Sequence, residues 1–221
     1  MLRRFAAAAV LLLTACGNQV DTPTPTPSAT PTIVPLTAVQ ATKAALKVTD
    51  LPKGWEGGVA SDPTPTLSAP VKYNPANCWM VRDPLRDQRS PAMAIRGQYF
   101  IRVSDNPVSV TEFIYSWPTS QRPLLHRITE TLRQCGTVTG TWYEGESYRI
   151  SVRQLAVPGL KDGIALRIGD PDDPKTTSVG YSAYVARGGT LLSLSTDSTV
   201  FTDATFAEFL TKAVARLDAV G

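Results

Sequence analysis

A serine and the single histidine are the residues that could together perform hydrolysis in this 221-residue chain. Ser182 lies in Gly180-Tyr181-Ser182-Ala183-Tyr184, which lacks the second glycine of the turn that exposes a nucleophilic serine in many hydrolases. His126, the residue available as a general base, lies among arginines in a segment with helical spacing. Its more ordinary role is that of a half-exposed helix residue. We therefore expect that the chain is not an enzyme, and an envelope hydrolase is the alternative that the sequence favours least.

Acidic residues offer a second chemistry, the binding of a metal ion. Asp170-Pro171-Asp172-Asp173-Pro174 could present carboxylates to Ca²⁺. The segment lacks the regularly spaced ligands and the distal glutamate of a calcium-binding loop, and its prolines favour a surface turn. The chain also has no HExxH motif, phosphate-binding glycine loop or dinucleotide fingerprint. We therefore expect neither a metal nor a cofactor.

Cys16 carries the most specific chemical signal, because of the residues that precede it. Arg3 and Arg4 are followed by an apolar run over residues 5–13, which is shorter than the roughly 20 residues that span a bilayer. This pattern is typical of a cleaved secretory leader. Leu13-Thr14-Ala15-Cys16 then resembles a bacterial lipobox. The resemblance implies a signal peptide over residues 1–15 and a diacylglyceryl group on Cys16, which would anchor the mature protein to the extracytoplasmic face of the cell membrane.

The remaining cysteines suggest a cross-link. The chain has three cysteines, an unfavourable count in an exported protein whose free thiols become oxidised. If Cys16 carries lipid, Cys78 and Cys135 remain and can form a disulfide. The alternatives are two buried free thiols or a metal site, although two thiolates and His126 are too few ligands for a tetrahedral metal. Cysteine parity therefore favours the disulfide.

The residues after Cys16 form a spacer before the folded part begins. Threonine and proline alternate over residues 21–35, a composition that cannot bury a core and favours an extended chain. We expect a linker over residues 16–37 and one domain over residues 38–221, which is long enough for a single core. The formal net charge of +3 comes from scattered basic residues, which argues against a nucleic-acid partner.

Hydrophobic patterning predicts an α+β domain with a largely antiparallel sheet flanked by helices. In the strand expected over residues 108–115, Phe113, Tyr115 and Trp117 share one face, whereas aliphatic residues share the other face and are interrupted by Glu112. The other expected elements are helices over residues 39–47, 120–134 and 204–220, and strands over residues 94–103, 140–143, 148–155, 163–168, 178–185 and 190–195, the last two joined by a turn at Arg187-Gly188-Gly189.

Several segments of the chain form a combination that points to a family. They are Leu51-Pro52-Lys53-Gly54-Trp55 after Ala45-Leu46, then Val108-Ser109-Val110-Thr111-Glu112-Phe113, a helix that ends at Cys135, and a tyrosine-bearing strand followed by an apolar strand within residues 180–195. Together they resemble the actinobacterial family of extracellular sensor domains named after the outer domain of the mycobacterial receptor kinase PknH. The likeness covers residues 38–221 and implies a twisted antiparallel sheet with helices and a cleft for an unidentified ligand.

The chain departs from that family in two ways that bear on function. The namesake has four domain cysteines in two disulfides, whereas this chain has two domain cysteines. We also expect no kinase or membrane-spanning segment before the domain, so a signal would have to pass through a partner. The resemblance brings no catalytic residues with it.

The lipobox and the family resemblance predict a membrane-anchored lipoprotein that acts as a non-catalytic ligand-binding or sensor module of the cell envelope. Its ligand would be a small molecule, a glycan, a lipid or an envelope protein. A carrier of lipid or glycolipid is the main alternative and requires a long apolar pocket, whereas a sensor cleft would be shallower and of mixed polarity. A structural or adhesive role is a further alternative. Most aromatic residues serve a core, but the candidates for lining a cleft are Tyr115, Trp117, Trp142 and Tyr181.

Overall fold

The chain divides into two units, Met1–Thr32 and Ile33–Gly221, and the fold described here is that of the second unit. The computed structural model describes residues 32–61, 72–86, 88, 92–104, 107–141, 145–172, 180–196 and 201–220. The expected signal peptide, Cys16 and most of the linker lie outside the described residues.

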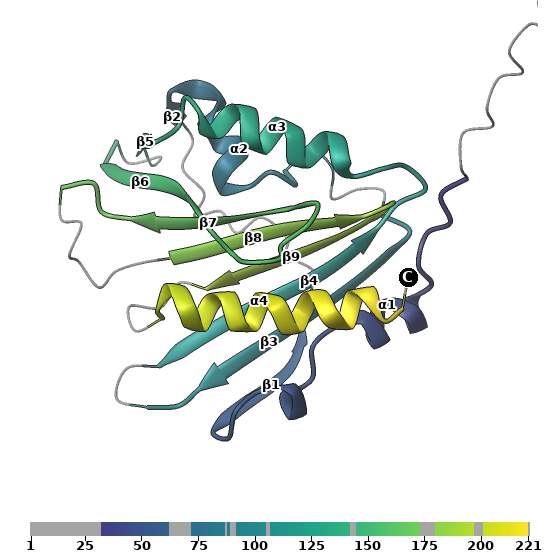
Figure 1. Cartoon of the computed structure of the whole chain (residues 1–221). Helices are drawn as coiled ribbons and strands as arrows, with labels where there is room; N and C mark the ends of the chain where they lie inside the picture. The colour runs from purple at the N-terminus through teal and green to yellow at the C-terminus, as the bar shows by residue number, and fades with distance from the viewer. Residues whose placement is uncertain are drawn as a thin grey trace, which may run out of the picture. The chain divides into compact units, whose positions relative to one another are not determined.

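A single nine-stranded antiparallel sheet with helices on both faces forms the fold (Figure 1). The predicted α+β class with an antiparallel sheet is therefore confirmed. The strands are β1 (Trp55–Ala60), β2 (Lys72–Asn74), β3 (Ala94–Arg102), β4 (Val108–Ser116), β5 (Thr137–Thr141), β6 (Ser147–Leu155), β7 (Gly163–Gly169), β8 (Gly180–Arg187) and β9 (Thr190–Thr196). The helices are α1 (Ala38–Ala44), α2 (Trp79–Arg82), α3 (Arg122–Leu132) and α4 (Asp203–Asp218), with 3₁₀ turns η1 (Val48–Asp50) and η2 (Ala76–Cys78).

The order of the strands is β1-β3-β4-β9-β8-β7-β6-β5-β2. Strands β5 to β9 follow one another across the sheet, and the β3–β4 hairpin joins this meander beside β9. β1 and β2 are consecutive in the chain but occupy opposite edges of the sheet. The sequence pattern predicts neither of these two strands, because β1 contains two glycines and β2 is only three residues long.

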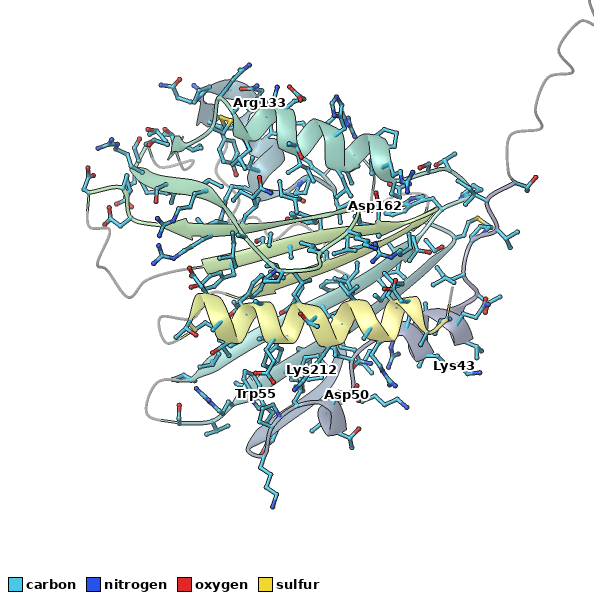
Figure 2. The ribbon with its side chains drawn as sticks, viewed as in Figure 1. Lys43, Asp50, Trp55, Arg133, Asp162 and Lys212 are labelled. Carbon is cyan, nitrogen blue, oxygen red and sulfur yellow. A yellow bond between two sulfur atoms is a disulfide. The ribbon has the colours of Figure 1, made fainter. Side chains whose placement is uncertain are left out.

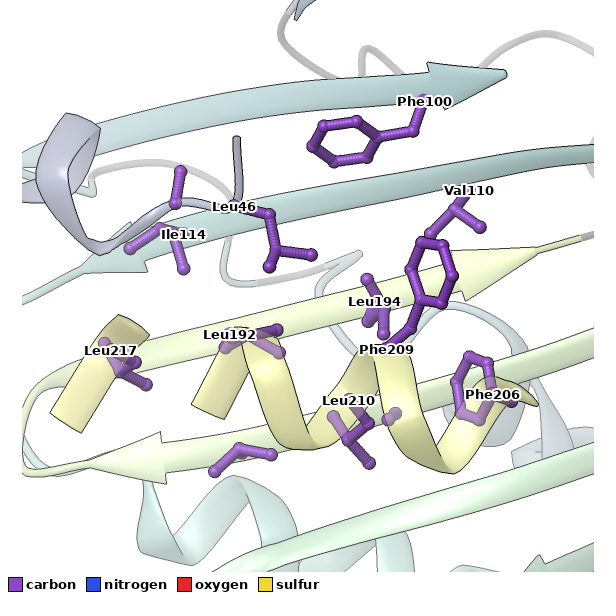
Figure 3. Packing of buried hydrophobic residues seen from close by; sticks show 14 of the residues in the cluster. Leu46, Phe100, Val110, Ile114, Leu192, Leu194, Phe206, Phe209, Leu210 and Leu217 are labelled. Atoms are coloured by element: carbon purple, nitrogen blue, oxygen red, sulfur yellow. The ribbon is translucent and has the colours of Figure 1, made fainter. Parts of the chain in front are cut away.

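α1 and α4 pack on one face of the sheet, over β3, β4, β8 and β9. Thr202 begins α4 by accepting a hydrogen bond from the Thr205 N–H at 3.1 Å. The apolar residues of α4 then recur at helical spacing and fill a core with residues from the four strands (Figure 3). The large fully buried members of this core include Leu46, Phe100, Ile114, Leu192, Leu194, Phe206, Phe209 and Leu210.

α3 packs on the opposite face, over β6, β7 and β8. It carries Pro123 in its first turn, where a missing N–H breaks no helical hydrogen bond, and it buries Leu124 and Ile128. Just beyond its C-terminal end, Cys135 forms a disulfide with Cys78. The predicted pairing is therefore confirmed, and it ties η2 and α2 to the end of α3.

Two of the predicted strands differ from the structure by two residues or more, whereas the others agree to within one residue at each end. The strand expected over residues 140–143 is β5, which begins three residues earlier at Thr137. Only Val138 and Gly140 of β5 are buried, so its threonine-rich start gives no apolar alternation to detect. The expected strand over residues 178–185 is β8, which begins at Gly180 and extends to Arg187.

Candidate functional site

A cleft of about 420 Å³ opens at the turn of the β8–β9 hairpin, and we call it the hairpin cleft. This volume is within the range of small-molecule sites. The hairpin forms one side, while the end of α4 and the segment that leads into α1 form the others. The lining residues are Ile33, Val34, Leu36, Arg187, Gly188, Gly189, Thr190, Leu217 and Asp218.

The hairpin turn is held firmly against the segment that leads into α3. The Trp117 N–H donates to the Gly189 carbonyl at 2.9 Å, and the Gln121 N–H donates to the Gly188 carbonyl at the same distance. Gly188 has a φ of +56°, a conformation that favours glycine. A Cβ atom on Gly189 would overlap the Trp117 carbonyl oxygen. Both glycines of the predicted turn are therefore required by its geometry.

The opposite wall is the segment before α1, which is fixed to the sheet by hydroxyl groups. The Leu36 N–H donates to Ser116 Oγ at 2.8 Å, and Ser116 Oγ lies 3.0 Å from Thr190 Oγ1. Ser116 and Thr190 are both buried polar residues. This chain of hydrogen bonds fixes Leu36, which lines the cleft, beside the hairpin.

An ion pair gives the cleft its polar side. Arg187 Nε lies 2.6 Å from Asp218 Oδ1, and Arg187 Nη1 also donates to the Lys161 carbonyl at 2.9 Å. The aliphatic side chains of Ile33 and Leu217 form an apolar side. The hairpin cleft therefore has mixed polarity, which suits a small ligand with an apolar body and a polar group.

A buried carboxyl lies beneath the two elements that flank this cleft. Glu112 projects from β4 into the core under α1 and α4 and is fully buried. Its Oε2 accepts a hydrogen bond from the Leu46 N–H at 2.8 Å. Burial raises the pKa of Glu112 to about 8, and the nearby Asp50 adds to the rise, whereas the Leu46 N–H and Arg216 act in the opposite direction. The protonated, neutral form of the carboxyl therefore predominates at pH 7.

Arg216 lies on α4 next to the cleft-lining residues Leu217 and Asp218. Its Nε lies 3.3 Å from Asp50 Oδ2 in η1 and donates to the Ala45 carbonyl at 3.4 Å. Asp50 is labelled in Figure 2, in the part of the fold below α4. Among the described residues, neither Glu112 Oε1 nor Arg216 Nη2 has a hydrogen-bond partner, although both atoms are buried.

Three of the four candidate aromatic residues are buried, and they divide between the two cores. Tyr115 and Trp117 stack on each other, with ring centroids 5.6 Å apart, in the core under α3. Tyr181 lies in the core under α4, stacked on Phe206 at 4.9 Å. The structure therefore does not bring these three rings into one cleft. Trp142 lies outside the described residues.

The other perturbed side chains belong to structural contacts. Burial raises the pKa of Tyr181 to about 12, and its hydroxyl donates to Asp203 Oδ1 at 2.7 Å at the start of α4. Burial likewise raises the pKa of Tyr73 to about 12, with the neighbouring Tyr148 contributing. Both phenols remain neutral at physiological pH, and neither lines the hairpin cleft.

The residues considered for catalysis and metal binding lie apart from the cleft. His126 is exposed on α3, Ser182 is half-buried in β8, and no hydrogen bond joins them in the described part of the chain. Asp170 accepts a hydrogen bond from the Asp172 N–H at 2.8 Å, as in a surface turn, and Asp172 pairs with Arg149. The described residues contain no group of three or more His, Cys, Asp or Glu side chains placed to bind a metal. None of the described helices is long and apolar enough to cross a membrane.

Comparison with known proteins identifies the fold. No family model matches the chain, and no curated protein matches it either. Among solved structures, the extracellular domain of PknH from Mycobacterium tuberculosis aligns with a TM-score of 0.60 and 15% identity, over 85% of this chain and 97% of that domain. An Rv0999 ortholog from Mycobacterium smegmatis aligns with a TM-score of 0.42 and 14% identity, over 76% of this chain and 92% of that one. The chain therefore has a PknH-like fold, as the sequence resemblance predicts.

Sequence reasoning identifies only parts of the candidate site. The pattern predicts the turn at Gly188 and Gly189, and it marks Glu112 as an interruption in an aliphatic face. It places Ile33 and Leu36 in the linker, and nothing in the local sequence indicates that they contact the hairpin. Leu36 is held there by one hydrogen bond to Ser116, which is 80 residues away in the sequence.

Proposed function

We propose that the chain is a non-catalytic ligand-binding or sensor module of the cell envelope, with the hairpin cleft as its ligand site. The cleft is the observation that carries this proposal, because it combines a small-molecule volume with an apolar side and the Arg187–Asp218 pair. Mixed polarity is what we expect of a sensor, whereas a lipid carrier requires a long apolar pocket. The PknH-like fold supports an extracytoplasmic location and a sensory role.

The proposed membrane attachment is a lipid on Cys16, followed by a linker that extends to residue 37. Ile33, Val34 and Leu36 fall within that predicted linker and also line the hairpin cleft. A ligand in the cleft would therefore contact the residues through which the domain joins its tether. Binding would change how this end of the linker is held, which gives the module a physical route for a signal to a partner.

Native mass spectrometry can test the cleft directly. Residues 17–221 would be secreted from a mycobacterial host and weighed under native and denaturing conditions, so that a non-covalent passenger appears as a mass difference. We expect Val34→Trp to abolish that difference, because Val34 lines the cleft and is 81% exposed, so a larger side chain can fill the opening without entering the core.

Val39→Trp is the matched control, since Val39 is 65% exposed on α1 and does not line the cleft. It should keep the passenger. A native mass without a passenger in the unmodified protein, or equal retention by the two variants, would contradict the hairpin cleft as the ligand site.

A further inference from the structure

Glu112 and Arg216 each leave a buried polar atom unsatisfied, and they contact neighbouring residues of the same short turn. Glu112 Oε2 accepts from the Leu46 N–H, and Arg216 Nε donates to the Ala45 carbonyl. Glu112 Oε1 and Arg216 Nη2 have no hydrogen-bond partner among the described residues. A buried carboxyl and a buried N–H in this state form a high-energy arrangement, because burial removes the water that would otherwise satisfy them.

The charged groups around Glu112 come from three elements. α4 supplies Arg216 and η1 supplies Asp50, and these two groups already form an ion pair at 3.3 Å. On β3, Gln98 lies directly opposite Glu112, and Arg96 lies on the same face of β3 as Gln98. On the other side β9 places Leu194 opposite Glu112. α1 presents alanines to this core, and its Lys43 is exposed.

Arg216 therefore has two acidic groups within its surroundings. In the structure Arg216 pairs with Asp50. Among the described residues, no ion pair joins Arg216 to Glu112. A neutral Glu112 offers little attraction, whereas an ionised Glu112 in a buried site attracts the guanidinium strongly. The partner of Arg216 thus depends on whether the Glu112 carboxyl holds its proton.

The same elements form two walls of the hairpin cleft. Leu217 and Asp218 follow Arg216 directly on α4, and both line the cleft. The Ala45-Leu46 turn ends α1, and α1 is entered from Leu36, another lining residue. A displacement of the backbone at Arg216 would reach the cleft from α4, and a displacement of the Ala45-Leu46 turn would reach it through α1.

We propose that Glu112 is a proton-controlled switch that sets the shape of the hairpin cleft. With a neutral carboxyl, Arg216 stays on Asp50 and the cleft has the form described here. When the carboxyl releases its proton to solvent, Arg216 turns toward Glu112, which moves Leu217 and Asp218 and weakens the binding of a ligand. This inference rests on the proposed function of the cleft. The raised pKa of Glu112, about 8, places the transition in the mildly alkaline range.

A pH titration followed by NMR tests the coupling without any ligand. The methyl signals of Leu36 and Leu217 would be recorded in the secreted protein, residues 17–221, between pH 5.5 and 9.5, together with the side-chain carboxyl carbon of Glu112. We expect the methyl signals and the carboxyl signal to shift with one shared midpoint near pH 8. Glu112→Gln should remove the methyl transition, whereas Glu56→Gln, a change at an exposed glutamate of β1, should preserve it.

Asp50→Asn provides a second variant that does not alter the buried carboxyl. Removing the Asp50 charge should move the shared midpoint to lower pH, because Asp50 contributes to the raised pKa of Glu112. Methyl signals that do not titrate, or that titrate unchanged in Glu112→Gln, would overturn the switch. This readout needs no ligand, so the two proposals can fail separately. If the methyl signals titrate but the mass spectrum shows no passenger, only the proposed ligand site is refuted. If a passenger is present but the methyl signals do not titrate, only the switch is refuted.

Discussion

Glu112 places a carboxyl group on a face of β4 whose other core residues are Val108, Val110 and Ile114. The side chain is fully buried, and only one of its two carboxyl oxygens has a hydrogen-bond partner among the described residues. Burial disfavours its charged form, so the folded protein retains a proton there that the unfolded chain releases. This difference in proton binding links the stability of the fold to pH.

The free energy of unfolding should fall as the pH rises through the range that Glu112 controls. The unfolded carboxyl has an ordinary pKa of about 4.3, and the folded one titrates at about 8. Below both values the two states bind the same proton, and between them the unfolded state gains stability at up to about 1.4 kcal/mol per pH unit. We expect Glu112→Gln to be more stable than the unmodified protein at pH 8 and nearly equal at pH 4, measured by urea unfolding.

The exposed Glu56→Gln change is again the control, and it should leave the pH profile of unfolding unchanged. A glutamine at position 112 keeps an acceptor for the Leu46 N–H, so loss of that hydrogen bond does not obscure the comparison. If the unmodified protein and Glu112→Gln lost stability in parallel between pH 5 and 8, another group would be the source of the pH dependence.

At the scale of elements, the β8–β9 hairpin determines where the cleft can form. Its turn accepts hydrogen bonds from the Trp117 and Gln121 N–H groups, which fix the hairpin to the segment between β4 and α3. Gly189 allows this close approach because it has no side chain. The cleft thus depends on a backbone contact as well as on the side chains that line it.

Gly189→Ala should separate the hairpin from Trp117 and destabilise the fold by about 1–3 kcal/mol, the cost typical of overpacking. The matched change is Gly136→Ala, because a Cβ atom at Gly136 meets nothing within 4 Å and this glycine has no positive φ. It should alter stability by less than about 0.5 kcal/mol. Chemical unfolding measures the free energy of unfolding of both variants. Equal values would show that the contact between Gly189 and Trp117 is not tight.

Glycine and aromatic residues are paired between neighbouring strands of the sheet, a contact that the local sequence does not show. Gly97 lies directly opposite Phe113, and a Cβ there would overlap the ring; Gly140 and Tyr148 are paired in the same way. α4 and β4 can be predicted because their periodicity is local. β1 and β2 cannot, because the two glycines of β1 and the three-residue length of β2 make sense only once the opposing strand is known. The cleft is hidden for the same reason, since Leu36 and Ser116 meet only through the fold.

At the scale of the whole molecule, the lipobox predicts that the domain is attached to a membrane through Cys16. Cys16→Ser should release the protein from the membrane fraction or leave its signal peptide uncleaved, because serine offers no thiol for the diacylglyceryl group. Fractionation with an antibody against the domain, together with the mass of the N-terminal peptide, measures both effects. Full membrane retention with normal cleavage of the variant would refute the lipoprotein prediction.

The antiparallel sheet, the helices and the disulfide could all be predicted from the sequence. Hydrophobic patterning and the family resemblance indicate the sheet and the helices, and cysteine parity indicates the disulfide. The position of the hairpin cleft could not be predicted, since three of the four aromatic residues predicted to line a cleft, Tyr115, Trp117 and Tyr181, belong to two separate cores. Tyr115 and Tyr181 are both nearly inaccessible to solvent, at 1% and 2% exposure. Aromatic residues supply large buried areas, so the sequence alone does not distinguish a ring that binds a ligand from one that fills a core.

The position of β1 and β2 at opposite edges of the sheet has a consequence for the order in which the protein assembles. A ribosome releases both strands before β3 and β5, the strands on which they pair. Cys78 likewise emerges 57 residues ahead of Cys135, so its thiol remains free until α3 has been made. The meander from β5 to β9 arrives last and supplies the centre of the sheet. Synthesis therefore delivers both edges of this sheet before its middle, and β2 has no strand to pair with until β5 has been made.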